Sequence, residues 1–322
     1  MICKHWPPAF TAGYGHEFPR TYVAFDLETT GFDRKTDVII EIGHVLVEDG
    51  VVTDELSVLL DWSKSSVVPL HWLVDRIANL RQKMSDRGIA HHLPYERLCK
   101  EGIDPVEALA FYRDFFAQLK ADGMPVVGHN VYRFDEPMLE ANLVGFQVCE
   151  EFAFGDWQLW DTLALEAATQ HGPREPKALP RPGETLRDWM QRASYLRAET
   201  NLTRTLVNKY GLVEKYGLDP RNSHSACYDA RLCHHMMQEF RAMLDAEPEP
   251  APAPVTLASV PAAPPPRAGR VVRAVAPRQP VVPVGLPKAA TEPTLFDGLP
   301  ADGSQDMVIH GDYGRRRKQR NR

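Results

Sequence analysis

Two acidic residues near the start of the chain have the type and spacing needed to hold a divalent metal ion. Asp26 and Glu28 stand two residues apart at the end of residues 21–27, a run rich in β-branched and aromatic side chains that predicts a strand. Side chains two apart on a strand point to the same face. The two carboxylates are therefore predicted to converge on one metal ion, although acids at an exposed strand end are also common.

A second motif, GHNVYRFD at residues 128–135, follows a short apolar run at 125–128 that predicts a buried strand. The motif forms a turn, and Asp135 is expected to begin a helix. An acid at this position also has an ordinary explanation, because the N-terminal end of the helix dipole favours negative charge.

The third motif is HSACYDA at residues 224–230. His224 and Asp229 share a face only if His224 lies just before a helix and Asp229 lies in its first turns. A histidine before a helix is usually a cap or a surface residue. It is the conjunction of three motifs, in this order and at the ends of elements, that favours a metal-dependent active site.

The elements around these motifs predict an α/β fold with one mixed five-stranded sheet flanked by helices. Three antiparallel strands come first, and Asp49-Gly50 marks the hairpin between the second and third. Asp161 is expected to cap a helix that follows the last strand. The predicted strands are 21–27, 38–47, 51–60, 125–128 and 158–160, and the predicted helices include 106–119, 136–143 and 225–243.

The composition changes near Ala246, and this change divides the chain. Residues 1–20 are predicted to be an N-terminal extension, and 21–246 the domain that contains all three motifs. Residues 247–322 are rich in Pro and Ala without periodicity, which predicts a disordered tail, and they end in a basic run at 315–322.

The composition also bears on location and partners. The chain has 322 residues, a net charge of −6 and five scattered cysteines, which we interpret as reduced thiols. No apolar run approaches the roughly 20 residues that cross a bilayer, so we expect a cytoplasmic protein without a membrane partner. The acidic charge argues against a broad duplex-binding surface but not against binding a chain end.

The three motifs together resemble those of the DEDDh exonucleases, the group that contains the proofreading epsilon subunit of bacterial DNA polymerase III, ribonuclease T and oligoribonuclease. The resemblance covers roughly residues 21–243, and the stretch LWDTL at 159–163 agrees with it. One departure is the long segment between the second and third motifs, with the insertion-like GPREPKALPRPGETL at 172–186. That departure bears on the substrate channel rather than on the chemistry.

The resemblance implies a ribonuclease H-like fold and a mechanism with two Mg²⁺ or Mn²⁺ ions about 3.5–4 Å apart. Asp26 would bridge both ions. Glu28 and Asp229 would complete the site of the ion that activates water, and Asp135 would hold the other ion. Ligation by oxygen alone favours hard cations over zinc.

The resemblance also assigns roles around the metal site. His224 would be the general base for the attacking water, since an imidazole with an ordinary pKa near 6.5 suits proton abstraction at neutral pH. Leu27, Thr30 and Asn130 would contact the terminal nucleotide, and the enzyme would require a free 3′ end.

Three functions remain open on sequence alone. The leading hypothesis is a 3′→5′ exonuclease for single-stranded or frayed DNA ends, with a role in replication or repair. The alternatives are an RNA-trimming exoribonuclease of the ribonuclease T or oligoribonuclease type, and a non-catalytic nucleic-acid-binding subunit with the same fold. Four acids converging on one site speak against the last, because a binding module has no need of them.

The tail contains one isolated apolar pair, Leu295-Phe296, within the sequence EPTLF. It resembles the Gln-x-x-Leu-Phe peptides that bind the bacterial sliding clamp, although Glu292 stands where Gln is usual. A clamp or a polymerase is therefore a candidate partner, with chance similarity as the alternative.

Overall fold

The computed structural model describes residues 18–86, 95–156, 158–171, 180–181, 183–196 and 205–245. The predicted tail at 247–322, including Leu295 and Phe296, and all but the end of the predicted N-terminal extension lie outside the described residues. All the motif residues lie within them.

One five-stranded mixed sheet forms the centre of the described body, as the sequence predicts. Its strand order is β3-β2-β1-β4-β5. The first three strands pair antiparallel, while β4 pairs parallel to β1 and β5 parallel to β4. The predicted bounds agree with the observed ones to within one or two residues: β1 Tyr22–Thr29, β2 Ile39–Glu48, β3 Val51–Leu59, β4 Val126–Gly128 and β5 Leu159–Asp161.

The hairpin between β2 and β3 forms where the sequence predicts it. Asp49 and Gly50 both have positive φ, at 51° and 82°, which is the geometry that a tight two-residue hairpin requires. Strand β2 is buried along nearly its whole length, whereas β3 is mostly exposed. Strand β3 is therefore an edge strand, and β2 and β1 carry the interior of the sheet.

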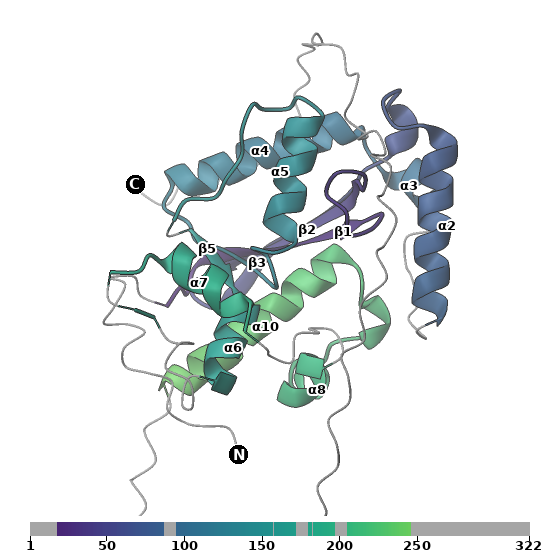
Figure 1. The fold of residues 1–322 in the computed structure, drawn as a ribbon. Helices are drawn as coiled ribbons and strands as arrows, with labels where there is room; N and C mark the ends of the chain where they lie inside the picture. Colours follow the sequence, from purple (N-terminus) through teal and green to yellow (C-terminus); the bar gives the residue numbers. More distant parts are fainter. Residues whose placement is uncertain are drawn as a thin grey trace, which may run out of the picture. The chain divides into compact units, whose positions relative to one another are not determined.

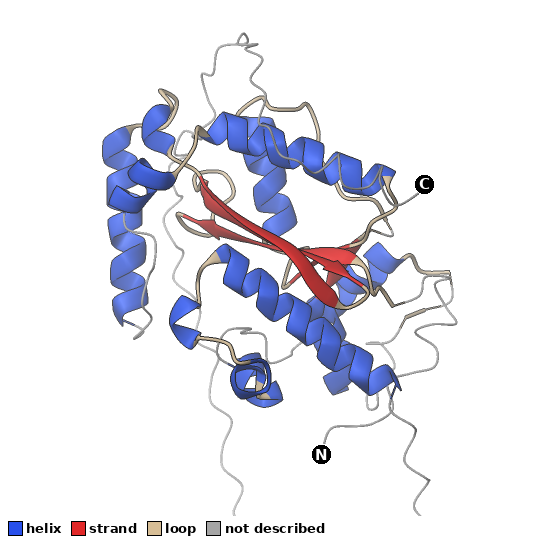
Figure 2. Cartoon of the chain, turned by 180° about the vertical axis from the view of Figure 1, so that it is seen from behind, coloured by secondary structure: helices blue, strands red, loops and turns tan. Residues whose placement is uncertain are grey.

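Helices cover both faces of this sheet. On one face lie α4 (Pro105–Ala121) and α5 (Asp135–Gly145), and on the other lies α10 (Ala226–Asp245), as Figures 1 and 2 show. Helix α4 begins where Asp104 accepts hydrogen bonds from the N–H groups of Val106 and Glu107, with proline at its first position. These helices lie where the sequence predicts them.

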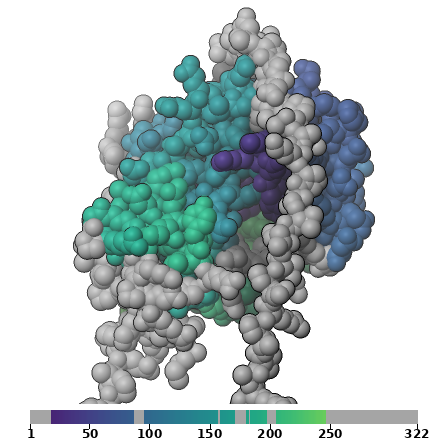
Figure 3. Space-filling model, viewed as in Figure 1, coloured from purple at the N-terminus to yellow at the C-terminus, as the bar shows by residue number. Residues whose placement is uncertain are grey.

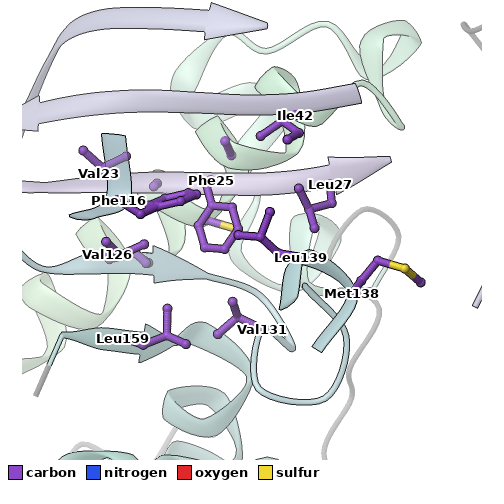
Figure 4. Close-up of a cluster of buried hydrophobic side chains, with 14 of the residues drawn as sticks. Val23, Phe25, Leu27, Ile42, Phe116, Val126, Val131, Met138, Leu139 and Leu159 are labelled. Atoms are coloured by element: carbon purple, nitrogen blue, oxygen red, sulfur yellow. The ribbon is translucent and has the colours of Figure 1, made fainter. Parts of the chain in front are cut away.

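The face toward α4 and α5 carries the main apolar core (Figure 4). Phe25 of β1 meets Phe116 of α4 edge to face, with ring centroids 5.1 Å apart. Leu27 and Ile42 lie on the same side, as alternation along β1 and β2 requires. The other face of β1 is consequently left for Asp26 and Glu28.

Several shorter elements complete the body. Of these elements only α6 was predicted, and α7 forms one wall of a surface cleft. No helix in the described part of the chain is both long and apolar enough to cross a membrane. The elements are η1 (Trp62–Lys64), α2 (Leu70–Asp86), α3 (Tyr95–Glu101), α6 (Thr162–His171), α7 (Leu186–Ser194), α8 (Val207–Tyr210), α9 (Leu212–Tyr216) and η4 (Pro220–Asn222).

Helix α10 approaches the sheet most closely at Gly43 of β2. A Cβ atom on Gly43 would lie 2.1 Å from the backbone nitrogen of Cys227 and 2.3 Å from the carbonyl carbon of Ala226. Such distances leave no room for any side chain, which is why glycine stands in the middle of an otherwise apolar strand. The first turn of α10 therefore rests directly on the backbone of β2.

We expect Gly43→Ala to lower the free energy of unfolding by about 1–3 kcal/mol, the usual cost of overpacking a filled interior. Urea denaturation monitored by circular dichroism would measure it. Thr53→Ala, at an exposed position of the neighbouring strand β3, is the control and should change stability by less than about 0.5 kcal/mol. An unchanged urea midpoint in Gly43→Ala would contradict the close contact.

Candidate active site

Strand β1 presents Asp26 and Glu28 to the side of the sheet that α10 covers. In the antiparallel register Asp26 pairs with Gly43, and Glu28 pairs with Glu41 of β2. Paired residues of an antiparallel ladder share a face. Because Gly43 is the point where α10 meets the sheet, Asp26 lies directly beside the start of that helix.

The third motif reaches the same place from α10. The helix begins at Ala226, so Asp229 lies in its first turn and His224 lies just before it, as the sequence requires for the two to act together. The Asp229 side chain is buried, at 6% exposure. Three potential ligand atoms, one each from Glu28, His224 and Asp229, all lie within 4.8 Å of one another.

The second motif brings Asp135 to the cluster from a turn between β4 and α5. Asn130 has φ of 60°, a left-handed conformation that asparagine tolerates better than most residues. Its backbone N–H donates to Asp161 Oδ1 at 2.8 Å. The turn ends where α5 begins at Asp135, which is 2% exposed. The three motifs, separate in sequence, thus converge at one place.

Burial, together with mutual repulsion, raises the pKa of the carboxylates at this site. Burial raises the pKa of Asp26 well above its ordinary value, and the charges of Asp135, Asp229, Glu28 and Glu41 raise it further. Burial likewise raises the pKa of Glu28, with Asp229 as its next largest cause. Such a set of like charges in one site is stable only when protons or cations neutralise it.

The two remaining motif carboxylates show the same pattern. Burial raises the pKa of Asp135 well above normal, and the nearby Asp161 adds to the shift. Burial raises the pKa of Asp229 to about 8, partly offset by a hydrogen bond with the backbone of His224. Asp135 and Asp229 therefore keep their protons to higher pH than exposed aspartates do in the metal-free protein.

The donor set fits hard divalent cations. Within the described residues, Asp135 Oδ1 and Asp229 Oδ1 are buried oxygens with no hydrogen-bond partner. Buried polar atoms are normally paired, so each of these oxygens is available to a cation. Carboxylate oxygens are the ligands that Mg²⁺ and Mn²⁺ prefer.

Two further acids at the site were not assigned there from the sequence. Glu41 is the single acid within the apolar run 38–47, a signal that could have marked it. Asp161 does cap α6 as predicted, by accepting from the N–H of Leu163 at 2.9 Å. It also binds the turn of the second motif, and burial raises its pKa to about 7.

The three residues predicted to contact the terminal nucleotide lie in surroundings that differ from one another. Leu27 is buried in the core, and Thr30 Oγ1 donates to Asp37 Oδ1 at 3.0 Å, so this hydroxyl stabilises the loop after β1. Asn130 Oδ1 is a buried oxygen without a hydrogen-bond partner in the described structure. The role of these residues in binding nucleotides stays a prediction.

The metal-free protein is expected to lose stability as pH rises from about 4 to about 8. Folded Asp229 has a pKa of about 8, whereas an unfolded aspartate has a pKa near 3.9. The folded state therefore binds more protons over this window, and the free energy of unfolding falls as pH rises. Urea titrations in chelator at about pH 5, 7 and 9 would measure the slope.

Asp229→Asn should flatten the dependence of the free energy of unfolding on pH, because it removes one proton-binding group. Glu48→Gln, an exposed acid at the far end of β2 from Glu41, is the matched control and should leave the slope unchanged. If the free energy of unfolding changed equally with pH in Asp229→Asn and the wild type, the raised pKa of Asp229 would be contradicted.

Comparisons with known proteins add a local likeness. No protein-family model matches the chain. It is 46% identical over 60 residues to the DNA polymerase III PolC-type of Clostridium perfringens, and 48% identical over 44 residues to that of Thermotoga petrophila. These segments cover 19% and 14% of the chain, which spans 4% and 3% of the two relatives.

Solved structures of exonuclease I show a partial likeness at low sequence identity. Escherichia coli exonuclease I in complex with a dT13 oligonucleotide is 16% identical, with a TM-score of 0.45 over 70% of this chain and 41% of that one. Exonuclease I from Methylocaldum szegediense is 15% identical, with a TM-score of 0.43 over 69% and 41%. With its three motifs, its sheet order and its local identity to the PolC-type polymerases, the body of this chain is confirmed to resemble the DEDDh exonucleases.

Proposed function

We propose that this protein is a metal-dependent 3′→5′ exonuclease that acts on single-stranded or frayed DNA ends. The observation that carries the proposal is the convergence of Asp26, Glu28, Asp135 and Asp229, four buried or half-buried carboxylates, beside His224. A purely structural role would not explain them, because burying like charges together destabilises a fold.

Each residue of the site has a distinct task in this proposal. Asp26, Glu28 and Asp229 would hold one Mg²⁺ or Mn²⁺ ion, and Asp26 and Asp135 the other. Bound in this way, the ions would supply a lowered pKa for the attacking water and charge stabilisation for the leaving 3′ oxygen. His224 accepts the proton of that water, so it must be neutral at the start of the reaction.

A cleft beside the site could accommodate the strand. It has a volume of about 760 Å³ and lies between the loop after β1, helix α5 and helix α7. In Figure 3 the purple loop after β1 reaches the surface beside the teal α5. Arg187 of α7 bonds Glu136 of α5 in a bidentate ion pair, with N–O distances of 2.8 and 2.7 Å, and so fixes one wall.

The exposed surface of this cleft suits unpaired bases. Phe32 is 81% exposed, and its ring lies 5.7 Å from that of Phe134, the residue before Asp135. At the α7 side Tyr195 is 72% exposed, and the Arg133 guanidinium lies 4.9 Å from its ring centroid. Exposed aromatic rings beside arginines are typical of surfaces that stack bases and contact phosphates.

The choice between DNA and RNA rests on the local likeness to PolC-type DNA polymerases, which supports DNA. An RNA-trimming exoribonuclease is the second candidate, since the same carboxylate site would hydrolyse either backbone. From the sequence alone we also propose a sliding clamp or polymerase as a partner for Leu295 and Phe296, and a cytoplasmic location.

End-labelled single-stranded DNA and RNA of matched sequence, each with Mg²⁺ or with chelator, would test the function. We expect metal-dependent shortening of the DNA from its 3′ end. Asp26→Ala should abolish cleavage because it removes the shared ligand. His224→Ala should lower turnover by about 10²- to 10⁴-fold, the usual contribution of a positioned base.

The pH–rate profile tests the proposed role of His224 as the general base. The wild-type rate should fall as pH drops through the imidazole pKa, and His224→Ala should lose that acidic limb. Circular dichroism of both variants would show that the fold is retained. Cleavage of neither strand by the wild type would favour a non-catalytic binding subunit, and cleavage of RNA alone would favour the exoribonuclease.

Tyr195→Ala should weaken binding of single-stranded DNA by about 5- to 150-fold, because stacking of one base on an aromatic ring contributes about 1–3 kcal/mol. Fluorescence anisotropy in an Asp26→Ala background would measure binding without cleavage. Tyr195→Trp should retain affinity, and Val106→Ala, an exposed apolar residue of α4 away from the cleft, is the control. Equal affinities throughout would place the strand elsewhere.

A further inference from the structure

Glu41 is a buried acid in the middle of the sheet to which the proposed chemistry gives no task. Glu41 is 1% exposed, and it lies opposite Glu28 in the register between β1 and β2. A buried carboxylate destabilises a fold unless hydrogen bonds or charges compensate it. Its presence in this buried strand therefore calls for a specific partner.

Two serines supply hydrogen bonds to one of its oxygens. Ser57 Oγ of β3 donates to Glu41 Oε1 at 2.5 Å, and Ser225 Oγ donates to the same oxygen at 3.3 Å. Glu41 Oε2 is buried and has no hydrogen-bond partner within the described residues. Glu41 thus links the centre of the sheet to the residue that precedes α10.

Ser225 occupies the position that controls the third motif. It directly follows His224, whose φ of 65° lies in the left-handed region that a non-glycine residue adopts only when its surroundings impose it. The Ser225 carbonyl accepts the N–H of Asp229 at 2.9 Å. Ser225 therefore joins the turn of His224 to the first turn of α10, and its hydroxyl anchors both to β2.

We propose that Glu41 is a positioning residue that holds His224, through the hydroxyl of Ser225, in place beside Glu28 and Asp229. The catalytic consequence rests on the proposed function, since it concerns how well His224 reaches the attacking water. The structural part, a fixed turn at His224, does not depend on any activity.

Four variants test the linkage on the full chain. Ser225→Ala removes the donor and Glu41→Ala the acceptor, and each should lower kcat by about 10- to 100-fold with little change in KM, the scale expected for a catalytic group displaced by about 1 Å. Glu41→Gln should recover most of that loss, because its amide oxygen still accepts. Ser57→Ala removes the other donor to the same oxygen, at a distance from His224, and is the matched control.

A second measurement needs no activity. NMR of the metal-free protein with ¹³C-labelled histidine would resolve imidazole signals from its 12 histidines, and the signal of His224 is assigned by its loss in His224→Ala. Ser225→Ala and Glu41→Ala should shift or broaden that signal, whereas Glu41→Gln and Ser57→Ala should leave it close to the wild-type position.

The outcomes separate the two proposals. The double variant Glu41→Ala/Ser225→Ala would support one shared linkage if its kcat were no lower than that of the more impaired single variant. A Glu41→Gln variant as impaired as Glu41→Ala would assign the effect to charge and overturn the proposal, as would an unshifted His224 signal in Ser225→Ala. A wild type without nuclease activity would overturn the proposed function, while the NMR comparison would still decide the role of Glu41.

Discussion

The contact between the first turn of α10 and the backbone of β2 is the constraint on which the site depends. Gly43 allows the helix to rest on the strand, and that contact sets Asp229 beside Asp26. The opposite face of the sheet is filled by the aromatic core around Phe25 and Phe116, which fixes the strands themselves. The carboxylates are consequently held together by packing that is strong enough to oppose their mutual repulsion.

That repulsion connects stability with the proposed chemistry. In the metal-free protein burial raises the pKa of Asp26 and of Asp229, and the cations of the proposed mechanism would take the place of the protons that these acids hold. The same environment leaves oxygens of Asp135 and Asp229 without hydrogen-bond partners in the described structure. A site whose buried carboxylate oxygens lack hydrogen-bond partners is suited to bind cations, and the linkage proposed for Glu41 would anchor His224, the proposed general base.

The sequence predicted the sheet well because its signals are local. A run of β-branched and aromatic residues marks β1, the Asp49-Gly50 pair marks the hairpin, and helical periodicity marks α4. Helix α2 was missed because only Leu73 and Ile77 of its residues are buried, so its apolar pattern is sparse. Helix α7 was missed because its apolar pattern, although helical in spacing, extends over only nine residues. The cleft lined by Phe32, Arg133 and Tyr195 was missed for a different reason: these residues come from three segments, and nothing local shows that they share a surface.

The sequence by itself determined the candidate site residues: the spacing of Asp26 and Glu28 on a strand, and the position of His224 just before a helix, follow from periods of local structure. Only the tertiary structure decided that Asp135 and Asp229 meet them, that Asp161 fixes the turn before α5, and that Glu41 reaches Ser225. The physical reason is that strand register and helix docking are set by packing between residues far apart in the chain. Local patterns specify which way a side chain faces on its own element, whereas distances across elements depend on how closely their backbones can approach.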